Sequence, residues 1–433
     1  MSHLHVSQHL RVEGRLHPHV LRHLERLGDV GDALGVPVYL VGGPVRDLLL
    51  GRPLLDIDVA IEGDAGAFAR ELAAPGADIA AHPEFNSATL SCFDGARIDV
   101  AGARSETYAH PGALPTVSPA DITEDLRRRD FTVNAMALAL AGPHRWGFVD
   151  PHRGYEHLRT GLLAALHARS FIDDPTRVLR AARFAARICL RPEPSTEQWL
   201  REAVAGGGGA LSTVSSERLL TELRYLLVEP TAAEALRLLA DWGALEPLGL
   251  PDPRPRADVL RALLIAGRRL SVRGTDALVP ATLAVLPEPH RVADWVSTWP
   301  ITAQERVDAQ QAAAMVLEAP AALFSTDVRS STLYLVLKDV ASAGLMAAWA
   351  AHGSPVRANI ERYARQLAHV RSDICGDDLI RAGFRAGPAF KSALGAALAA
   401  KLDRGADAAE QLRVALTVLK VDAGPGQSGH RRR

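Results

Sequence analysis

The spacing of apolar positions divides the chain into two regions with different predicted structures. Up to about residue 160, short apolar runs alternate with segments of helical periodicity, which predicts a small α/β domain with a mixed sheet. We expect strands at residues 38–41, 55–61, 77–81, 87–92, 96–101 and 146–149, and helices at residues 17–34 and 68–73.

After residue 160 the strand pattern largely disappears, and the segments are rich in Ala, Leu and Arg, which favour helices. Helices are predicted at residues 175–190, 215–228, 232–244, 257–269, 302–317 and 330–351. Gly and Pro residues predict connections at 206–209, 251–255 and 280–289, and residues 422–433 are expected to be disordered.

The composition narrows the class of protein. The 433 residues can bury a sizeable core and correspond to roughly two to four domains. Because 48% of the residues are hydrophobic, an intrinsically disordered protein is excluded. The formal net charge is −1, so binding of nucleic acid would have to rely on local basic surfaces.

The three cysteines, Cys92, Cys189 and Cys375, fit neither a disulfide framework nor a zinc site by number or spacing. They predict reduced thiols in a cytoplasmic protein. Residues 1–13 are rich in histidine and lack an apolar core, which argues against a signal peptide, and no apolar run reaches membrane-spanning length.

Two aspartates stand at alternate positions of the second predicted strand. Residues i and i+2 of a strand point to the same side, so Asp56 and Asp58 share a face while Ile57 and Val59 point away from it. Two adjacent carboxylates repel each other, and nearby cations would keep both ionised. A pair of Mg²⁺ ions suits them if the substrate is a nucleoside triphosphate. The alternative is a pair of solvated aspartates at a strand end.

A glycine pair follows the first predicted strand. Gly42 and Gly43 allow backbone N–H groups to approach a ligand closely, and a helix at residues 44–50 would direct its N-terminus towards phosphate. Arg46 could add charge-assisted hydrogen bonds to phosphate. The alternative is an ordinary strand-to-helix turn in which Arg46 pairs with Asp47.

A third carboxylate, Asp99, lies in the predicted strand at 96–101, with Ile98 and Val100 facing the core. A neighbouring strand could bring Asp99 beside Asp56 and Asp58. The alternative is a strand aspartate that faces solvent.

The segment at residues 125–137 combines an acidic residue, an amide and three consecutive arginines. Asp130 and Asn134 are four residues apart and would share a face of a helix, where a carboxylate and an amide together can bind a ribose hydroxyl. The arginines, which include Arg129, could neutralise a triphosphate or an RNA backbone. The alternative is a helix start with a capping aspartate and a solvated basic patch.

The segment at residues 171–187 predicts a helix that starts at Asp174 and Pro175, with Asp174 as the N-cap. Arg177 and Arg180 begin a basic stripe that continues along this otherwise apolar helix to residues 183 and 187. An aspartate beside an arginine can also read a base. Asp174 would accept from the amino group of cytosine or adenine while Arg177 donates to the adjacent ring nitrogen.

Guanine and uracil present a carbonyl where cytosine and adenine carry the amino group. A carbonyl cannot donate a hydrogen bond to the carboxylate, so these two bases would be disfavoured. The pair would therefore accept C and A and refuse G and U. On this hypothesis, replacing Arg177 by alanine abolishes base discrimination before it abolishes metal binding.

These segments, in this order, resemble the class II tRNA nucleotidyltransferases, the CCA-adding enzymes, which share a fold superfamily with DNA polymerase beta and are closely related to bacterial poly(A) polymerases. The family patterns G-G-x-V-R-D with D-x-D, R-R-D-F-T-x-N-A, and D-P-x-R with L-R-A-A-R-F-A-A-R match residues 42–58, 128–135 and 173–187. Residues 217–223 resemble the family's E-R-x-x-x-E-L element, and residues 104–115 resemble its flexible loop. The resemblance is specific over about residues 36–230 and looser in the segments at 374–379 and 387–388.

The resemblance implies an α/β nucleotidyltransferase head with a polymerase beta-like mixed sheet at residues 1–160, followed by an all-α neck (161–235), body (236–350) and tail (351–433). It implies template-independent addition of C and/or A nucleotides to the 3′ end of tRNA, from CTP and ATP, with Mg²⁺ as the metal. In the family pattern Asp56 and Asp58 hold the metals and Asp99 assists them. Asp130 and Asn134 contact the ribose, Arg129 contacts the triphosphate, and Asp174 and Arg177 read the base with Arg180 nearby.

Three positions depart from the family pattern: Asp173 replaces the usual Glu, His157 stands where Asp is usual, and Asn86 stands where Gly is common. The change at His157 bears on the coupling of head and neck that is thought to help the switch from C to A addition. A CC-adding or an A-adding specialist therefore remains open. A poly(A) polymerase and a non-catalytic RNA-binding relative are further alternatives, and the intact Asp56/Asp58 pair argues against the second of these.

Overall fold

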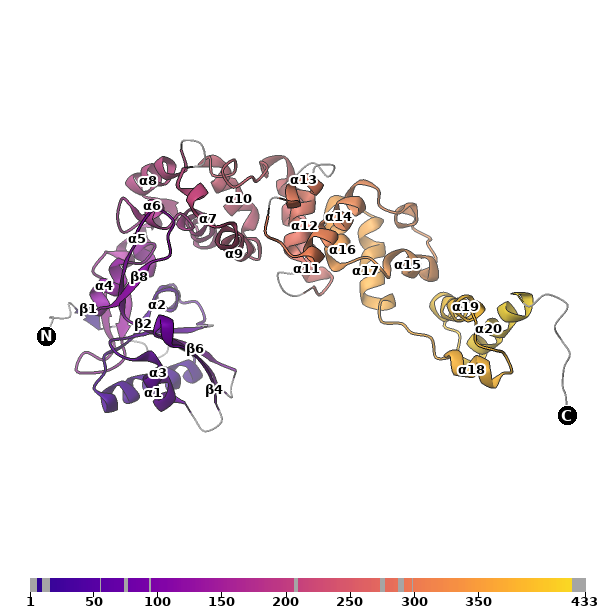
Figure 1. Ribbon diagram of the computed structural model, residues 1–433, viewed down its shortest axis with the longest axis horizontal. Coiled ribbons are helices and arrows are strands. Elements are labelled where there is room, and N and C mark those ends of the chain that lie inside the picture. The colour runs from indigo at the N-terminus through magenta and orange to yellow at the C-terminus, as the bar shows by residue number, and fades with distance from the viewer. Residues whose placement is uncertain are drawn as a thin grey trace. The chain divides into compact units, whose positions relative to one another are not determined.

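The computed structural model describes residues 6–9, 16–54, 56–73, 77–92, 95–205, 209–272, 277–286, 292–297 and 299–422. The chain folds as two compact units, Met1–Leu250 and Pro251–Arg433, and Figure 1 shows that the described strands belong to the first. The features predicted at Leu55, at 206–208 and at 423–433 lie outside the described residues. The division into head, neck, body and tail stays a prediction.

The first unit is built on an eight-stranded mixed sheet with the order β1-β10-β9-β2-β3-β6-β5-β4, which confirms the predicted mixed sheet. Its strands are β1 (Val6–His9), β2 (Val38–Val41), β3 (Ile57–Ile61), β4 (Asp78–His82), β5 (Ser87–Ser91), β6 (Arg97–Gly102), β9 (Ala137–Ala139) and β10 (Gly147–Val149). Only β3 and β6 pair in parallel, and the other neighbours are antiparallel.

The two faces of the sheet are covered by different helices. Helices α1 (Pro18–Leu34) and α3 (Ala65–Leu72) contact β2, β5 and β6. Helix α4 (Ile122–Arg127) packs on the other face, where Ile122 and Leu126 form a buried cluster with Tyr39 and Ala60. Asp58 lies two residues before Ala60 in β3, so the alternation of the strand places it on the face that α4 covers.

Apart from two short strand pairs, β7 (Arg104–Thr107) with β8 (Thr116–Pro119) and β11 (Leu162–Leu163) with β12 (Arg191–Pro192), the rest of the regular structure in the first unit is helical. The remaining α-helices are α2 (Gly43–Leu49), α5 (Gly154–Thr160), α6 (Ser170–Asp173), α7 (Arg177–Ile188), α8 (Pro194–Val204), α9 (Ser216–Leu227) and α10 (Ala232–Asp241). The small hairpin of β7 and β8 leaves the sheet after β6. The ring of Phe131 packs against Phe184 of α7, with 6.1 Å between ring centroids, and against Phe171 of α6, with 6.3 Å. These contacts join α7 to the α4 side of the sheet.

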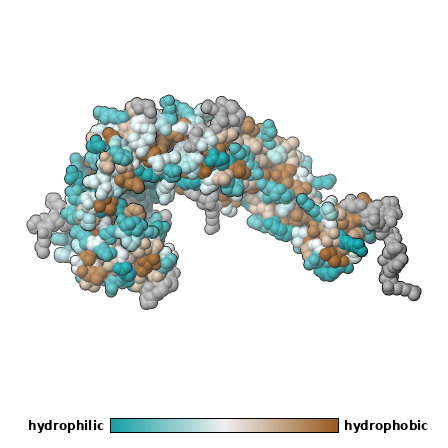
Figure 2. Space-filling model, in the orientation of Figure 1, coloured by the Kyte–Doolittle hydropathy of each residue, from teal (hydrophilic) through white to brown (hydrophobic). Residues whose placement is uncertain are grey.

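The second unit is helical in its described residues. Its α-helices are α11 (Ala257–Arg269), α12 (Leu278–Val285), α13 (Val292–Ser297), α14 (Ala303–Leu317), α15 (Ser330–Leu337), α16 (Ser342–Ala351), α17 (Val356–Arg362), α18 (Gly376–Arg381), α19 (Ala389–Arg404) and α20 (Ala408–Asp422). Thr302 and Glu305 form a capping box at the start of α14. On the face of the molecule shown in Figure 2, apolar residues lie in groups among hydrophilic ones, as is normal for a protein surface.

Two predictions for the second unit were wrong. The helix expected at 330–351 is two helices, α15 and α16, bent by 115°. The side chain of Gln311 in α14 stabilises the break, because it accepts a hydrogen bond from the Ala341 N–H and donates one to the Asp339 carbonyl. Pro280 lies in the first turn of α12 and not in a connection. A residue in the first turn has no partner within the helix for its N–H, so proline loses no hydrogen bond there.

Among the described residues, no single helix has both the length and the apolar character that a membrane span requires. The bent pair of α15 and α16 passes that test by length and composition alone.

The departure at Asn86 has a structural explanation. Asn86 adopts a positive φ of 45°, its side-chain oxygen accepts from the Ala65 N–H at the start of α3 (2.9 Å), and its amide donates to the Gly63 carbonyl (3.0 Å). We expect Asn86→Ala to lower the free energy of unfolding by about 1–3 kcal/mol, since it removes both bonds and leaves a residue that tolerates this backbone poorly.

Urea denaturation combined with hydrogen exchange of the α3 amides measures this loss. Asn86→Gly is the matched variant, because glycine restores the backbone freedom and loses only the two bonds. Equal stability of the alanine variant and the natural protein would contradict the prediction.

Candidate active site

A pocket of about 740 Å³ lies where the sheet meets α7. It collects side chains from the turn after β2, from β3, from the segment after α4, and from α7. With the exception of Asp99, all the candidate catalytic and nucleotide-binding residues predicted from the sequence line this pocket: Gly42, Gly43, Arg46, Asp56, Asp58, Arg129, Asp130, Asn134, Asp174, Arg177 and Arg180.

Two of the predicted carboxylates, Asp58 and Asp99, lie side by side on adjacent strands. Asp58 pairs directly with Asp99 in the parallel register of β3 and β6. Burial, together with the negative charges of Asp99 and Asp56, raises the pKa of Asp58 to about 6. Asp99 does not line the pocket, since its oxygens are engaged by the Thr89 hydroxyl and by the Arg97 guanidinium, the latter at 3.1 Å.

The donor set fits a divalent metal that is shared with a substrate. Carboxylate oxygens are the ligands that Mg²⁺ prefers, and Asp56 and Asp58 face the same pocket. Among the described residues, no group of three or more His, Cys, Asp or Glu side chains could hold a metal ion alone. An ion bound here would therefore need further oxygens from a phosphate or from water.

The raised pKa of Asp58 predicts a stability effect that can be measured without metal. In metal-free buffer we expect Asp58→Asn to raise the free energy of unfolding by about 2 kcal/mol at pH 8, because it removes a partly buried charge and its repulsion by Asp99 and Asp56. The native carboxyl binds its proton more tightly than an unfolded aspartate, whose pKa is about 4. The natural protein therefore loses stability as the pH rises from about 4 to 6, and the difference between the two proteins should vanish below pH 4.

Urea denaturation in EDTA at several pH values measures this effect. A destabilised Asp58→Asn variant, or a gain that does not depend on pH, would contradict it.

The glycine turn brings an arginine over the pocket. Gly42 has a φ of 72°, and a Cβ atom at this position would lie 2.8 Å from Nη1 of Arg129. A larger residue at position 42 would therefore displace the arginine. Arg46, in contrast, is 3% exposed and is bonded to Asp47 (3.0 Å) and to the side-chain oxygen of Asn134 (2.6 Å). Through these bonds Arg46 supports the side chain of Asn134. The Arg46–Asp47 pair is the contact that the alternative interpretation of this turn predicted.

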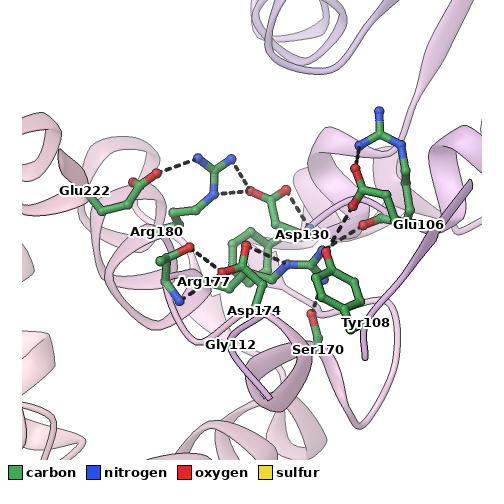
Figure 3. Close-up of polar contacts among 12 residues, drawn as sticks. Glu106, Tyr108, Gly112, Asp130, Ser170, Asp174, Arg177, Arg180 and Glu222 are labelled. Carbon is green, nitrogen blue, oxygen red and sulfur yellow. Dashed lines mark hydrogen bonds and ion pairs between the residues drawn. The ribbon is translucent and has the colours of Figure 1, made fainter. Parts of the chain in front are cut away.

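Asp130 and Asn134 lie together, but not on an α-helix. Asn134 ends a 3-10 turn at Thr132–Asn134, Asp130 lies two residues before that turn, and the Asn134 amide donates to Asp130 Oδ1 at 3.0 Å. Burial opposes ionisation of Asp130, but the Arg180 charge and the Asn134 bond outweigh it and lower the pKa of Asp130 to about 2. Figure 3 shows Arg180 between Asp130 (2.6 Å) and Glu222 of α9 (3.2 Å).

Asp174 and Arg177 also meet at the pocket, although the predicted helix start was wrong by two residues. Helix α7 begins at Arg177, and Asp174 Oδ1 accepts from the backbone and hydroxyl of Thr176 and from Arg218 at 3.0 Å. Oδ2 lies 3.9 Å from Arg177 Nε. Arg177 is 5% exposed and donates to the Ser170 hydroxyl (2.7 Å), which is visible in Figure 3, and to the Arg128 carbonyl (2.8 Å).

Several contributing residues were not identified as site residues from the sequence. Glu106 and Tyr108 line the pocket, and the Tyr108 hydroxyl donates to Glu106 at 3.0 Å. Arg218 donates to the Gly112 carbonyl at 2.8 Å, so it ties residues 108–115 to α9. The segments at 104–115 and 217–223 already resembled elements of the family in sequence. Only the folded chain shows that the two segments contact each other. His157, the second departure, contacts Thr132 of the turn, with 2.8 Å between ring Nδ1 and Oγ1.

A mixed-sheet head with paired aspartates and a basic, arginine-lined pocket defines a nucleotidyltransferase. Residues 38–164 match the family "Poly A polymerase head domain", and residues 189–252 match "Probable RNA and SrmB-binding site of polymerase A". The chain is 34% identical to the A-adding tRNA nucleotidyltransferase of Halalkalibacterium halodurans over 384 residues, which cover 86% of each protein. This chain therefore belongs to the tRNA nucleotidyltransferase family.

Two further relatives extend the comparison. The CC-adding tRNA nucleotidyltransferase of Deinococcus radiodurans is 41% identical over 206 residues, which cover 47% of this chain and 54% of the relative. The Thermotoga maritima CCA-adding enzyme, solved in complex with tRNA, superposes with a TM-score of 0.68 at 29% identity, covering 95% of this chain and 100% of the other. Enzymes that add C, A or both therefore all resemble this chain.

Proposed function

We propose that this protein adds C and/or A nucleotides to the 3′ end of tRNA from CTP and ATP, without a nucleic-acid template. One observation carries the proposal: a single pocket holds the aspartates Asp56 and Asp58, the Asp130–Asn134 turn, and the Asp174–Arg177 pair. These groups suit the phosphates, the ribose and the base of one nucleotide. We also propose a cytoplasmic location. Cys189 and Cys375 are free thiols, and cysteines stay reduced in the cytoplasm.

Asp56 and Asp58 would hold the divalent metal, which we propose is Mg²⁺. When bound, such ions supply charge stabilisation at the α-phosphate and the pyrophosphate, and they activate the attacking hydroxyl. Arg129 lies above the Gly42 turn and would bind the triphosphate through its guanidinium. Asp130 is kept ionised by Arg180, so that it can accept a hydrogen bond from a ribose hydroxyl beside the Asn134 amide.

Base selection would come from the protein alone. Oδ1 of Asp174 accepts bonds from Thr176 and Arg218, whereas Oδ2 lies 3.9 Å from Arg177 Nε, and both residues line the pocket. Oδ2 can therefore accept from the amino group of cytosine or adenine. The buried contacts of Arg177 with Ser170 and Arg128 fix its guanidinium, so that it can donate to the neighbouring ring nitrogen.

One assay tests the function and separates its alternatives. Purified protein is offered tRNA transcripts that end at the discriminator base, at C or at CC, with each labelled nucleotide and Mg²⁺. Addition of CCA, of CC only or of A only would support the proposal and identify the specialisation. Long A tails on unrelated RNA would indicate a poly(A) polymerase, and an absence of incorporation would indicate a non-catalytic RNA-binding relative.

A further inference from the structure

A buried carboxylate lies directly beneath the nucleotide pocket and is not itself part of the lining. Asp125, in helix α4, is 1% exposed. Its Oδ1 accepts from the Arg104 N–H and from Nε and Nη2 of Arg128. Its Oδ2 accepts from Nε (3.2 Å) and Nη2 (2.8 Å) of Arg129. A single carboxylate thus holds two consecutive arginines, one on each oxygen.

The bond pattern at Arg129 leaves one guanidinium nitrogen that Asp125 does not hold. Nε and Nη2 are held by Asp125, whereas Nη1 makes no hydrogen bond in the part of the chain that the structure describes. Nη1 lies beside Gly42, 2.8 Å from the place of a Cβ atom, in a pocket that Arg129 itself lines. Two-point binding fixes the plane of a guanidinium, so Asp125 determines where Nη1 points.

Without this clamp, Arg129 would have other acidic partners. Asp56 and Asp58 line the same pocket as Arg129. An arginine that paired with these carboxylates would take the place of a metal ion and would no longer face the triphosphate. The full negative charge of Asp125 competes with them, because the pKa of Asp125 is lowered by Arg129 and Arg128 despite its burial.

The other arginine is much less dependent on Asp125. Arg128 Nη1 also pairs with Glu106 at 2.8 Å, and its Nε is also bonded to the Arg104 carbonyl at 3.1 Å. Loss of the Asp125 charge would leave these contacts in place. Arg129 has no second side-chain acceptor among the described residues. Any effect of Asp125 on the nucleotide should therefore pass mainly through Arg129.

We propose that Asp125 is a positioning residue that aims Arg129 at the triphosphate and keeps it away from the Asp56/Asp58 pair. The inference rests on the proposed function, because it assigns the nucleotide contact to Arg129. Asp125 itself does not touch the substrate. Its role is to keep in place the one guanidinium nitrogen of Arg129 that it does not bond, before the nucleotide arrives.

The test is a double-mutant cycle on steady-state incorporation, with Asp125→Asn, Arg129→Gln and the double variant assayed against CTP and ATP. Arg129→Gln should raise KM by about 10–100-fold, since it removes a charged contact, and Asp125→Asn should raise KM by about tenfold. In the double variant we expect the KM of Arg129→Gln alone, within about threefold. Single effects that multiply in the double variant would overturn the proposal.

Two further variants separate positioning from folding. Arg129→Lys keeps the charge but cannot be held at two points, so its KM should also rise about tenfold, and a natural KM would overturn the proposal. Glu124→Gln removes a neighbouring carboxylate of α4 whose partner, Arg127, is 70% exposed, and it should leave KM unchanged. Stability of the Asp125→Asn variant is measured by urea denaturation. If its loss of activity is explained entirely by the fraction of unfolded protein, the proposal is also overturned. An inactive natural protein would instead refute the proposed function.

Discussion

Asp56→Ala is expected to abolish nucleotide incorporation while leaving the protein folded and able to bind tRNA. Asp56 is exposed at the start of β3, so its removal creates no cavity. It leaves Asp58 as the only member of the proposed metal-binding pair, and two-metal sites contribute several kcal/mol of transition-state stabilisation. We therefore expect incorporation to fall by at least about 10³-fold. Tritiated or ³²P-labelled CTP and ATP, with tRNA transcripts, provide the measurement.

Asp78→Ala is the control, because Asp78 is an exposed carboxylate on β4, at the far edge of the same sheet. It should behave as the natural protein does. Affinity for tRNA, measured by gel shift at fixed salt, should stay within about threefold for both variants, because phosphate contacts dominate RNA affinity. Substantial incorporation by Asp56→Ala would refute the assignment of the metal to this pair.

The part of the site that follows the alternation of strands could be predicted from the sequence. Asp58 and Asp99 lie on one face because Ile57, Val59, Ile98 and Val100 must be buried on the other, and a parallel pairing then sets them side by side. The boundaries of the six predicted strands agreed within one or two residues, whereas β1, β7, β8, β9, β11 and β12 were not predicted. A period of two leaves little freedom when one face of a strand is in the core.

The helical period was a weaker guide. Asp130 and Asn134 do contact each other, but through a 3-10 turn rather than on a helix face. The break between α15 and α16 occurs at Lys338–Ala341 without a glycine or proline, so the local sequence contains no helix breaker. Gln311, from another helix, supplies the hydrogen bonds that the broken segment needs. Such long-range contacts cannot be read from a window of neighbouring residues.

The supporting residues of the site were unpredictable for the same reason. Arg46 reaches Asn134 across 88 positions of the chain, and Arg180 reaches Asp130 across 50. Asp125 was not singled out from the sequence, where it is one of several acidic residues. Its importance comes from its burial and from the two arginines that share it, which only the folded chain shows.

Asp174→Asn is expected to admit GTP and UTP while leaving metal binding intact. A carboxylate can only accept hydrogen bonds, whereas an amide carries both a carbonyl oxygen and an NH₂ group and can rotate to present either. The NH₂ group could then donate to the carbonyl of guanine or uracil, while the adjacent ring N–H of these bases would still face a donor, the Arg177 guanidinium. We expect the preference for C and A over G and U to fall by about tenfold, because one of the two contacts no longer rejects G and U.

Incorporation of each labelled nucleotide in single-nucleotide assays, expressed as kcat/KM ratios, measures the change. Arg177→Ala is the less informative variant, since Arg177 also holds Ser170 and the Arg128 carbonyl and its loss would disturb both. Asp173→Asn is the matched control: it makes the same chemical change one residue earlier, at a side chain that pairs with Arg169 and does not line the pocket. It should keep the natural selectivity.

Continued refusal of GTP and UTP by Asp174→Asn would mean that the carboxylate does not read the base. In that event the role of Asp174 would be structural, through its bonds to Thr176 and Arg218. The two roles differ in their expected kinetics. A structural loss lowers kcat/KM for all four nucleotides alike, whereas loss of base reading changes the ratios between them.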